Sequence, residues 1–344
     1  MATPRPREPL TGTLLALVAA ALFGATTPLV KHFGEGLGAF ATAALLYGGA
    51  FLVSVPRIRA PAAHLRRVHI ARVVGAAVLG ACIAPALFAW GIARVSGSVG
   101  SLLLTSETVA TVLLARLFLG EQLGGRIVLA IALIVTGTAI LAGAGGGANV
   151  SGAIAIVLAT IAWAFDNVIT RPLADVDSVG VIRWKSAVGA TLSTIIALAW
   201  ERGSRPSLAS VIVLAAAGAF GYGLSLRAYL AAQTRVGAAR TGSVFAVAPF
   251  VAALASAVAA MQWPALALYL AAVPIALGVI LHATERHAHL HRHEAEAHEH
   301  LHRHDDGHHD HVHDPPVLGE HRHAHRHAAI EHEHEHAGDP DAHH

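Results

Sequence analysis

Five polar or charged residues lie within or at the ends of long apolar stretches of this sequence: Glu107, Asp166, Asn167, Lys185 and Arg227. An ionised group inside a bilayer is costly, so such residues usually face a cavity or a partner and serve function. A carboxylate there can carry a proton or bind a cationic substrate group, and a basic residue can pair with it or contact an anionic substrate. We therefore predict that these five residues line a substrate or proton pathway.

Each of these residues also has a structural interpretation. Glu107 lies near the middle of the apolar stretch 97–117, where it could be a hydrogen-bonded structural side chain beside Ser106 and Thr108. Asp166 lies near the end of its stretch, where a helix cap or an ion pair at the membrane surface would also explain it. Basic side chains at such ends can reach back to water without serving transport.

The composition excludes an ordinary soluble protein. The 344 residues are 54% hydrophobic and 13% charged, with mean hydropathy +0.55, whereas soluble domains carry about 25% charged residues. Residues 1–284 hold 19 Lys and Arg against 8 Asp and Glu, and the remainder holds 5 against 14. The single cysteine, Cys82, excludes a disulfide framework within the chain. The sequence thus predicts a basic membrane body followed by an acidic tail.

Apolar runs long enough to cross a bilayer recur along residues 11–282. Ten can be drawn with mostly short connections, and the expected fold is an all-α polytopic membrane bundle, because helices satisfy their own backbone hydrogen bonds in lipid. The predicted spans are 11–31, 36–55, 71–93, 97–117, 127–144, 152–170, 179–200, 208–231, 241–261 and 264–282.

Basic residues are divided unequally between the two predicted membrane faces. If the N-terminus is cytoplasmic, 15 Lys and Arg lie on or towards the inside and 4 lie outside, which agrees with the positive-inside rule. Residues 1–10 are polar and lead directly into a span, so we expect a retained first helix and not a signal peptide. We therefore predict a multi-pass protein of the cell membrane with both termini in the cytoplasm.

The body contains an internal repeat. Segment 23–31 resembles segment 163–171, and segment 93–95, which contains Arg94, matches segment 234–236, which contains Arg235, at nearly the same spacing. Each copy holds five spans, an odd number, so the second copy must be inverted, and inverted repeats place a transporter's substrate site near the midplane between the halves. The predicted divisions are an N-terminus 1–10, repeats 11–144 and 151–282, and a tail 283–344.

Three short motifs follow one another in an order that is specific. They are FGATTPLVK at 23–31, a Leu-Gly-Glu turn at 119–121 after the fourth span, and a fifth span that contains glycine. In this order they resemble the EamA branch of the drug/metabolite transporter superfamily, over about residues 11–282. The resemblance implies ten helices, cytoplasmic termini, a central cavity and the movement of small metabolites, often outwards. The second repeat departs from the pattern, with Ala-Met-Gln-Trp at 260–263 in place of an acidic turn.

Other residues within or between the spans are further candidates. We predict that four prolines kink or break their helices and take part in gating: Pro28, Pro85, Pro249 and Pro274. Four aromatic residues either line a cavity or serve as packing or membrane-interface residues: Trp90, Trp163, Tyr222 and Tyr229. Glu121, flanked by Arg116 and Arg126, is interpreted as a salt-bridged turn with a structural role.

The tail has a composition of its own. It is charged, low in complexity and almost free of large apolar residues, so we expect it to be disordered. Histidines alternate with other residues, Asp and Glu among them, and so supply ligands suited to Zn²⁺, Ni²⁺, Co²⁺ or Cu²⁺. The predicted metal ligands are His287, His289, His291, His293, His298, His300, His302, His304, His308, His309, His311, His313, His321, His323, His325, His327, His332, His334 and His336.

These observations favour a secondary transporter that exports a small metabolite, such as an amino acid or an amine, and carries a metal-binding regulatory tail. Export of Zn, Ni or Co is the alternative. It is disfavoured because His32, His64 and His69 lie at span ends or in a loop, whereas a metal path would be expected to offer His or Cys at mid-membrane. A membrane metal sensor that transports nothing is a further alternative.

The membrane body contains neither an HExxH nor a GxSxG motif, so the sequence does not predict an enzyme. No cofactor is required for the predicted function, although the tail is expected to bind a divalent transition metal. The expected partners are the lipid bilayer, a small-molecule substrate and metal ions. A homodimer is left open, and no nucleic acid is expected.

Overall fold

The structure is a computed structural model. It describes residues 8–54, 67–119, 124–144, 150–170, 174–201, 203, 206–236, 238–261, 266–283, 287–293, 297–302, 321–326 and 330–336. The chain divides into two compact units, the body Met1–Glu285 and the tail Arg286–His344.

The described part of the body is helical. The first half contains α1 (Glu8–Gly24), α2 (Thr26–Phe33), α3 (Ala39–Ser54), α4 (Arg67–Val78), the π-helical η2 (Leu79–Ile83), α5 (Ala84–Ile92), α6 (Gly97–Leu103), α7 (Ser106–Leu119) and α8 (Gly125–Ala144). The second half contains α9 (Val150–Thr170), α10 (Ala174–Trp200), α11 (Leu208–Ala217), the π-helical η4 (Gly218–Leu224), α12 (Ser225–Val236), α13 (Ala238–Phe245), α14 (Ala248–Ala259) and α15 (Leu266–Ala283).

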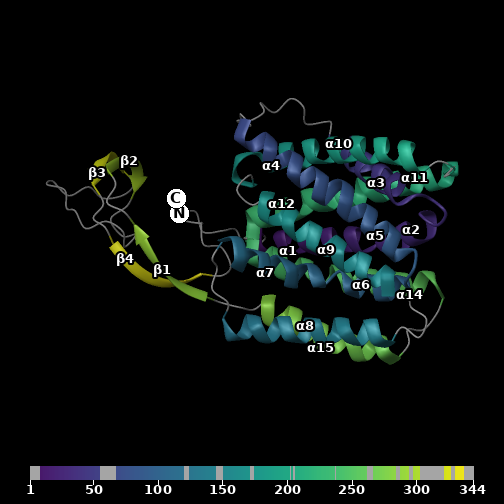
Figure 1. The fold of residues 1–344 in the computed structure, drawn as a ribbon. Helices are drawn as coiled ribbons and strands as arrows, with labels where there is room; N and C mark the ends of the chain where they lie inside the picture. The colour runs from purple at the N-terminus through teal and green to yellow at the C-terminus, as the bar shows by residue number, and fades with distance from the viewer. Residues whose placement is uncertain are drawn as a thin grey trace. The chain divides into compact units, whose positions relative to one another are not determined.

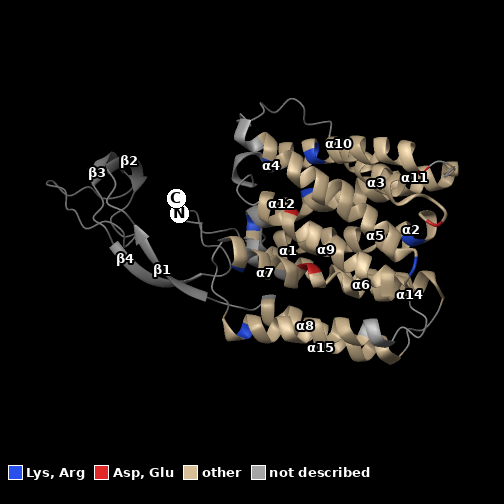
Figure 2. Cartoon of the chain, viewed as in Figure 1, with Lys and Arg blue, Asp and Glu red and all other residues tan. Residues whose placement is uncertain are grey.

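Helical segments of membrane-spanning character recur through the described body. Large apolar side chains such as Leu52 and Leu198 are exposed on its surface, as expected for a face in contact with lipid. Figure 2 shows charged residues gathered mainly near the ends of the helices. Six segments have the length and composition to cross a bilayer: Leu10–Phe33, Ile70–Ile92, Gly97–Phe118, Val150–Thr170, Gly180–Trp200 and Leu208–Ala232. Four shorter apolar helices lie at Ala39–Ser54, Gly125–Ile140, Ala248–Ala259 and Leu266–His282. The predicted all-α membrane bundle is therefore confirmed.

Glycines at equivalent positions show how the two halves pack as inverted copies. α1 packs along α12 and α9 packs along α5 (Figure 1), so the first span of each half contacts the third span of the other. Gly12 on α1 lies against Arg235, and Gly152 on α9 lies against Arg94. A Cβ atom at either glycine would meet these neighbours, so the close approach requires a residue without a side chain. We call the two ends of the body the Arg94 end and the Arg235 end.

Three of the four prolines coincide with interruptions of the α-helical pattern in the described chain. Pro28 follows the turn between α1 and α2, Pro249 follows the turn between α13 and α14, and Pro85 follows the π-helical η2. Proline lacks an N–H and cannot continue the helical hydrogen bonds, so each interruption lies about one turn before it. Pro274 lies inside α15, which runs without a break. The role of these residues in gating stays a prediction.

The tail contains four short strands, β1 (His287–His293), β2 (Ala297–His302), β3 (His321–Arg326) and β4 (Ile330–His336). β1 pairs with β4 and β2 pairs with β3, both in antiparallel orientation. The composition predicts disorder for the tail, and this stays a prediction; the pattern of the sequence accounts for the strands that are described. Histidine at every second position has the period of two that a β-strand requires.

Candidate functional site

Glu107 lies at a helix N-terminus within a membrane span. The span Gly97–Phe118 is interrupted between α6 and α7, where Thr105 Oγ1 donates to the Leu102 carbonyl oxygen at 2.6 Å and the Glu107 N–H donates to the Leu104 oxygen at 3.1 Å. These contacts between residues three apart replace the α-helical pattern for one turn. Glu107 then stands in the first turn of α7, where the positive end of the helix stabilises a carboxylate.

A hydrogen bond joins Glu107 to the other repeat. Asn167 on α9 donates through Nδ2 to Glu107 Oε1 at 2.9 Å. Glu107 is half-buried, and the amide carries no charge to compensate the carboxylate. Two of the five residues predicted to line the pathway are thus in contact across the repeats.

Asp166 and Lys185 form a second pair in the same region. The Lys185 ammonium on α10 donates to Asp166 Oδ2 on α9, and both residues lie close enough to Glu107 to act on it electrostatically. Asp166 is 2% exposed, and its Oδ1 atom is buried with no hydrogen-bond partner among the described residues. A buried polar atom without a partner is uncommon and marks a place where a ligand or a water molecule would bind.

The backbone carbonyl of Gly80, next to Asp166, has no N–H donor within its own helix. In the π-helical η2 the Ala84 N–H bonds to the Leu79 oxygen, five residues back. The corresponding donor for the Gly80 oxygen would be residue 85, which is a proline and has no N–H. The Gly80 oxygen instead accepts from Tyr47 Oη at 2.6 Å and from Trp163 Nε1 at 2.9 Å.

Because Gly80 has no side chain, η2 can lie close to α9. A Cβ atom at Gly80 would meet the Asp166 carboxylate, and a Cβ atom at Gly221 in η4 would meet the Thr26 side chain. Gly80 and Gly221 stand at equivalent positions of the two repeats, and so do Thr26 and Asp166. The two π-helices therefore occupy equivalent places, but a carboxylate packs against the first and a threonine against the second.

We call Glu107, Asn167, Asp166, Lys185 and Gly80, with the two donors Tyr47 and Trp163, the Glu107 cluster. A row of aromatic rings begins at Tyr47. Tyr47 packs against Tyr222 with centroids 5.4 Å apart, and Tyr222 packs against Phe23 at 5.6 Å. The row continues from Phe23 to Phe245 at 5.8 Å and from Phe245 to Tyr229 at 5.1 Å. Trp163 belongs to the cluster, and Tyr222 and Tyr229 belong to the row. The sequence left these three residues undecided between cavity and packing or interface roles.

Arg227 lies outside the cluster. Its Nη1 atom donates to the Val53 carbonyl oxygen at 2.7 Å, in the last turn of α3, where a cation stabilises the exposed carbonyl groups of a helix end. The sequence analysis allowed both Lys185 and Arg227 to pair with an acid. Lys185 pairs with Asp166, whereas Arg227 bonds to a backbone carbonyl. Glu121 lies outside the described residues.

Tyr47 and Gly80 were not identified from the sequence. The signal that could have found Gly80 is Pro85 within an apolar span, because a proline leaves carbonyl groups about one turn earlier without a donor. Tyr47 lies 33 residues before Gly80, and its contact follows from the packing of α3 against η2. Sequence spacing alone does not predict such a contact.

The described side chains contain no group of three or more His, Cys, Asp or Glu residues placed to hold a metal ion. The histidine side chains between His287 and His336 lie outside the part that the structure describes. Metal binding by the tail therefore stays a prediction.

Both halves of the body match one known protein family. A model of the EamA-like transporter family matches residues 10–143 and matches again at residues 150–284. The chain belongs to the EamA-like transporter family. The double match confirms the resemblance found from the short motifs. This EamA-like protein is accordingly a multi-pass membrane transporter of the drug/metabolite type, and the family consists of transporters and not enzymes.

A solved crystal structure is similar to this EamA-like protein in fold. The two superpose with a TM-score of 0.59 at 19% sequence identity, and the match covers 80% of this chain and 97% of the other. At this identity the likeness shows the fold alone. The comparison with curated proteins finds no match.

Proposed function

We propose that this transporter exports a small metabolite with a cationic amino group, such as an amino acid or an amine, across the cell membrane. The observation that supports this proposal is the buried Asp166 Oδ1 atom, which has no partner among the described residues. In the cluster Asp166 pairs with the Lys185 ammonium, whereas Glu107 accepts a hydrogen bond from the uncharged amide of Asn167. The excess of negative charge favours a substrate that brings a positive charge.

Lys185 supplies the positive charge that pairs with Asp166 when no substrate is bound. Its ammonium group neutralises Asp166 while the site is empty, because an unpaired buried carboxylate would be strongly unfavourable. A substrate amino group that binds Asp166 Oδ1 or Glu107 competes for the same negative charge. The Glu107–Asn167 bond joins the two repeats, so it must rearrange when one repeat rocks against the other during alternating access.

The orientation and the tail complete the proposal. Both termini lie in the cytoplasm, supported by the excess of Lys and Arg on that predicted side. The tail binds a divalent transition metal and regulates transport. Its support is the strand register, which sets His287 opposite His336 and His298 opposite His325 along paired backbones.

The experiment that tests the proposal uses the purified full chain in proteoliposomes. Fluxes of amino acids, of amines and of Zn²⁺ and Ni²⁺ are measured with and without a pH gradient. Glu107→Gln and Asp166→Asn are expected to lower the flux of an amine or amino acid at least tenfold, as for loss of a hydrogen bond to a charged group. Glu35→Gln is the matched control, since Glu35 is exposed on the loop after α2. Unchanged flux in both cluster variants, or flux of metal alone, contradicts the proposal.

A further inference from the structure

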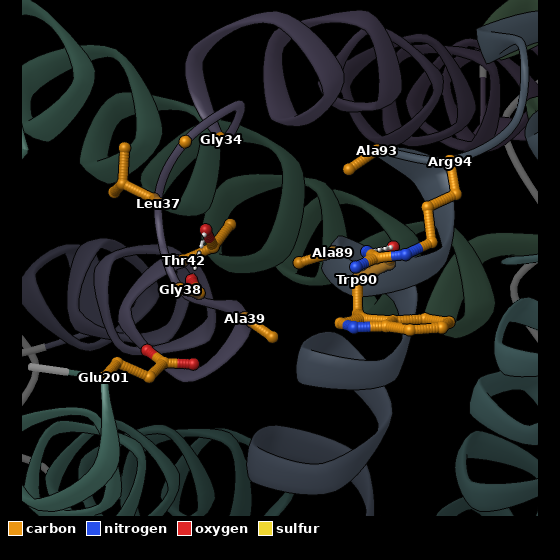
Figure 3. Close-up of a pocket in the computed structure, with 11 residues that line it drawn as sticks. Gly34, Leu37, Gly38, Ala39, Thr42, Ala89, Trp90, Ala93, Arg94 and Glu201 are labelled. Carbon is orange, nitrogen blue, oxygen red and sulfur yellow. Dashed lines mark hydrogen bonds between the residues drawn. The ribbon is translucent and has the colours of Figure 1, made fainter. Parts of the chain in front are cut away.

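A pocket of about 500 Å³ opens at the Arg94 end of the body. Figure 3 shows it between the loop that joins α2 to α3, the end of α5 and Glu201. An apolar groove of about 420 Å³ adjoins it, since Ala39 and Trp90 line both. The groove continues along Ile154 and Leu158 on α9, whose side chains are exposed on the surface of the body. A polar pocket that continues into an apolar groove fits an amphipathic molecule.

Arg94 is held in place over an aromatic ring in this pocket. Its guanidinium lies 3.6 Å from the centroid of the Trp90 ring, and its Nη1 atom donates to the Trp90 carbonyl oxygen at 2.7 Å. A guanidinium carries five N–H donors in a rigid fork that matches a phosphate group. Trp90 is 38% exposed at the end of its span, a position typical of tryptophan at the level of lipid headgroups.

Two other charged residues described at this end, Glu201 and Lys31, have partners of their own. Both carboxylate oxygens of Glu201 accept backbone N–H groups, from Phe40 and Ala41, each at 2.9 Å. The positive end of α3 thus offsets the Glu201 charge, and Figure 3 shows Glu201 across the pocket from Arg94. Lys31 donates to the Ile92 and Val95 carbonyl oxygens at 3.0 and 2.7 Å. Glu35 is exposed and does not line the pocket. Among the described residues, no carboxylate pairs with Arg94.

We propose that the Arg94 end binds an anionic phospholipid. The lipid phosphate accepts hydrogen bonds from the free N–H groups of Arg94, and one acyl chain lies in the groove beside Trp90, Ile154 and Leu158. The Arg94 pocket thus takes the lipid headgroup, and the apolar groove takes the acyl chain. The fork of Arg94 provides charge complementarity for the phosphate, and a lipid-facing apolar groove is already surrounded by acyl chains in the bilayer. The site is separate from the Glu107 cluster and does not depend on the substrate.

The inverted repeat supplies a matched control. Arg235 stands at the position equivalent to Arg94, and its Nη1 atom donates to the Ala231 carbonyl oxygen at 2.6 Å, the same contact four residues back. Both arginines are exposed, and both lie against an equivalent glycine. At Arg235, however, Ala231 occupies the place of Trp90. The equivalent arginine therefore lacks the indole ring on which Arg94 is stacked.

Native mass spectrometry of the purified full chain in detergent tests this inference. The chain is titrated with phosphatidylglycerol and, separately, with phosphatidylcholine of the same acyl chains. The wild type should retain phosphatidylglycerol more tightly. Arg94→Gln should weaken phosphatidylglycerol binding about tenfold, Arg94→Lys should do so less, and Arg235→Gln should leave it unchanged. Ile154→Trp, which fills the groove, should weaken binding of both lipids.

Three results would overturn the inference. The first is an equal loss in Arg94→Gln and Arg235→Gln, which would indicate a general charge effect. The second is equal affinity of the wild type for both lipids. The third is displacement of phosphatidylglycerol by millimolar inorganic phosphate, which would indicate a site for a soluble anion. If Arg94→Gln does not fold, as judged by thermal unfolding, Trp90→Leu removes the stacking partner while keeping the charge, and it should also weaken phosphatidylglycerol binding.

Discussion

Asn167 donates a hydrogen bond of 2.9 Å to Glu107, and this bond joins the two inverted repeats beside an interruption in a membrane span. The site it marks is asymmetric although the fold is not. The internal repeat places Ala248 at the position equivalent to Glu107 and Thr26 at the position equivalent to Asp166. The Glu107–Asn167 hydrogen bond and the Asp166–Lys185 pair are therefore each present only once among the described residues.

A double-mutant cycle should show that Glu107 and Asn167 act as one unit. Glu107→Gln and Asn167→Leu should each lower transport roughly tenfold, because each removes the same hydrogen bond. The double variant should then be no slower than the slower single variant. Initial flux rates in proteoliposomes provide the measurement. Effects that multiply would show that the two residues contribute independently.

Removing one member of the Asp166–Lys185 pair should destabilise the body more than removing both. Asp166→Asn leaves the partly buried Lys185 ammonium, whose side chain is 16% exposed, without its counter-charge, at a cost of about 3 kcal/mol, the low end for a buried pair. Asp166→Asn combined with Lys185→Met removes both charges and should recover a large part of the loss. Thermal unfolding in detergent, followed by tryptophan fluorescence, measures this order. A double variant no more stable than Asp166→Asn would contradict the prediction.

A methyl group at Gly80 should disturb both stability and transport. The added Cβ would meet the Asp166 carboxylate, so Gly80→Ala must displace α9 or the ion pair and should lower the melting temperature and the flux together. Gly75→Ala on α4 is the matched control, because nothing lies within 4 Å of a Cβ there and alanine favours a helix by up to about 1 kcal/mol. A loss of equal size in both variants would argue against the contact with Asp166.

The folded protein should tolerate the loss of one of the two side-chain donors to the Gly80 carbonyl oxygen better than the loss of both. Tyr47→Phe and Trp163→Phe each leave the other donor in place and should cost about 1 kcal/mol beyond any change in packing. The double variant leaves a buried carbonyl unpaired, so its loss of stability should exceed the sum of the two single losses. Tyr269→Phe on the exposed face of α15 is the control. Losses that merely add would mean that another donor replaces the pair.

Deleting residues 286–344 should separate metal binding from transport. The body and the tail are distinct compact units, so the truncated chain should keep its melting temperature and, without added metal, its flux of amine or amino acid. Isothermal titration with Zn²⁺ should show loss of most metal binding, because 21 of the 25 histidines lie in the deleted segment. If truncation abolishes flux while the melting temperature is unchanged, the tail belongs to the transport path and export of metal becomes the better function.

The apolar pattern of the chain already predicts the architecture of the membrane body. The length and spacing of the apolar runs predict helices that cross a membrane, because a bilayer admits few other structures. The nearly constant spacing between similar segments establishes the repeat, and the odd number of spans in each copy requires its inversion. The sequence also predicts Glu107, Asp166, Asn167 and Lys185 as candidates for the site, because a charged or polar side chain in an apolar run is physically costly wherever the helix packs.

Which of these residues contact one another follows from the packing of the helices and not from the sequence pattern. Lys185 could have paired with either acid and contacts Asp166, whereas Arg227 binds the backbone of α3. Tyr47 and Gly80 entered the site through a π-helix and the packing of α3, and the Arg94 pocket depends on the meeting of α3, α5 and Glu201. Apolar periodicity specifies each helix locally, while contacts between residues 19 to 174 positions apart depend on how the helices pack.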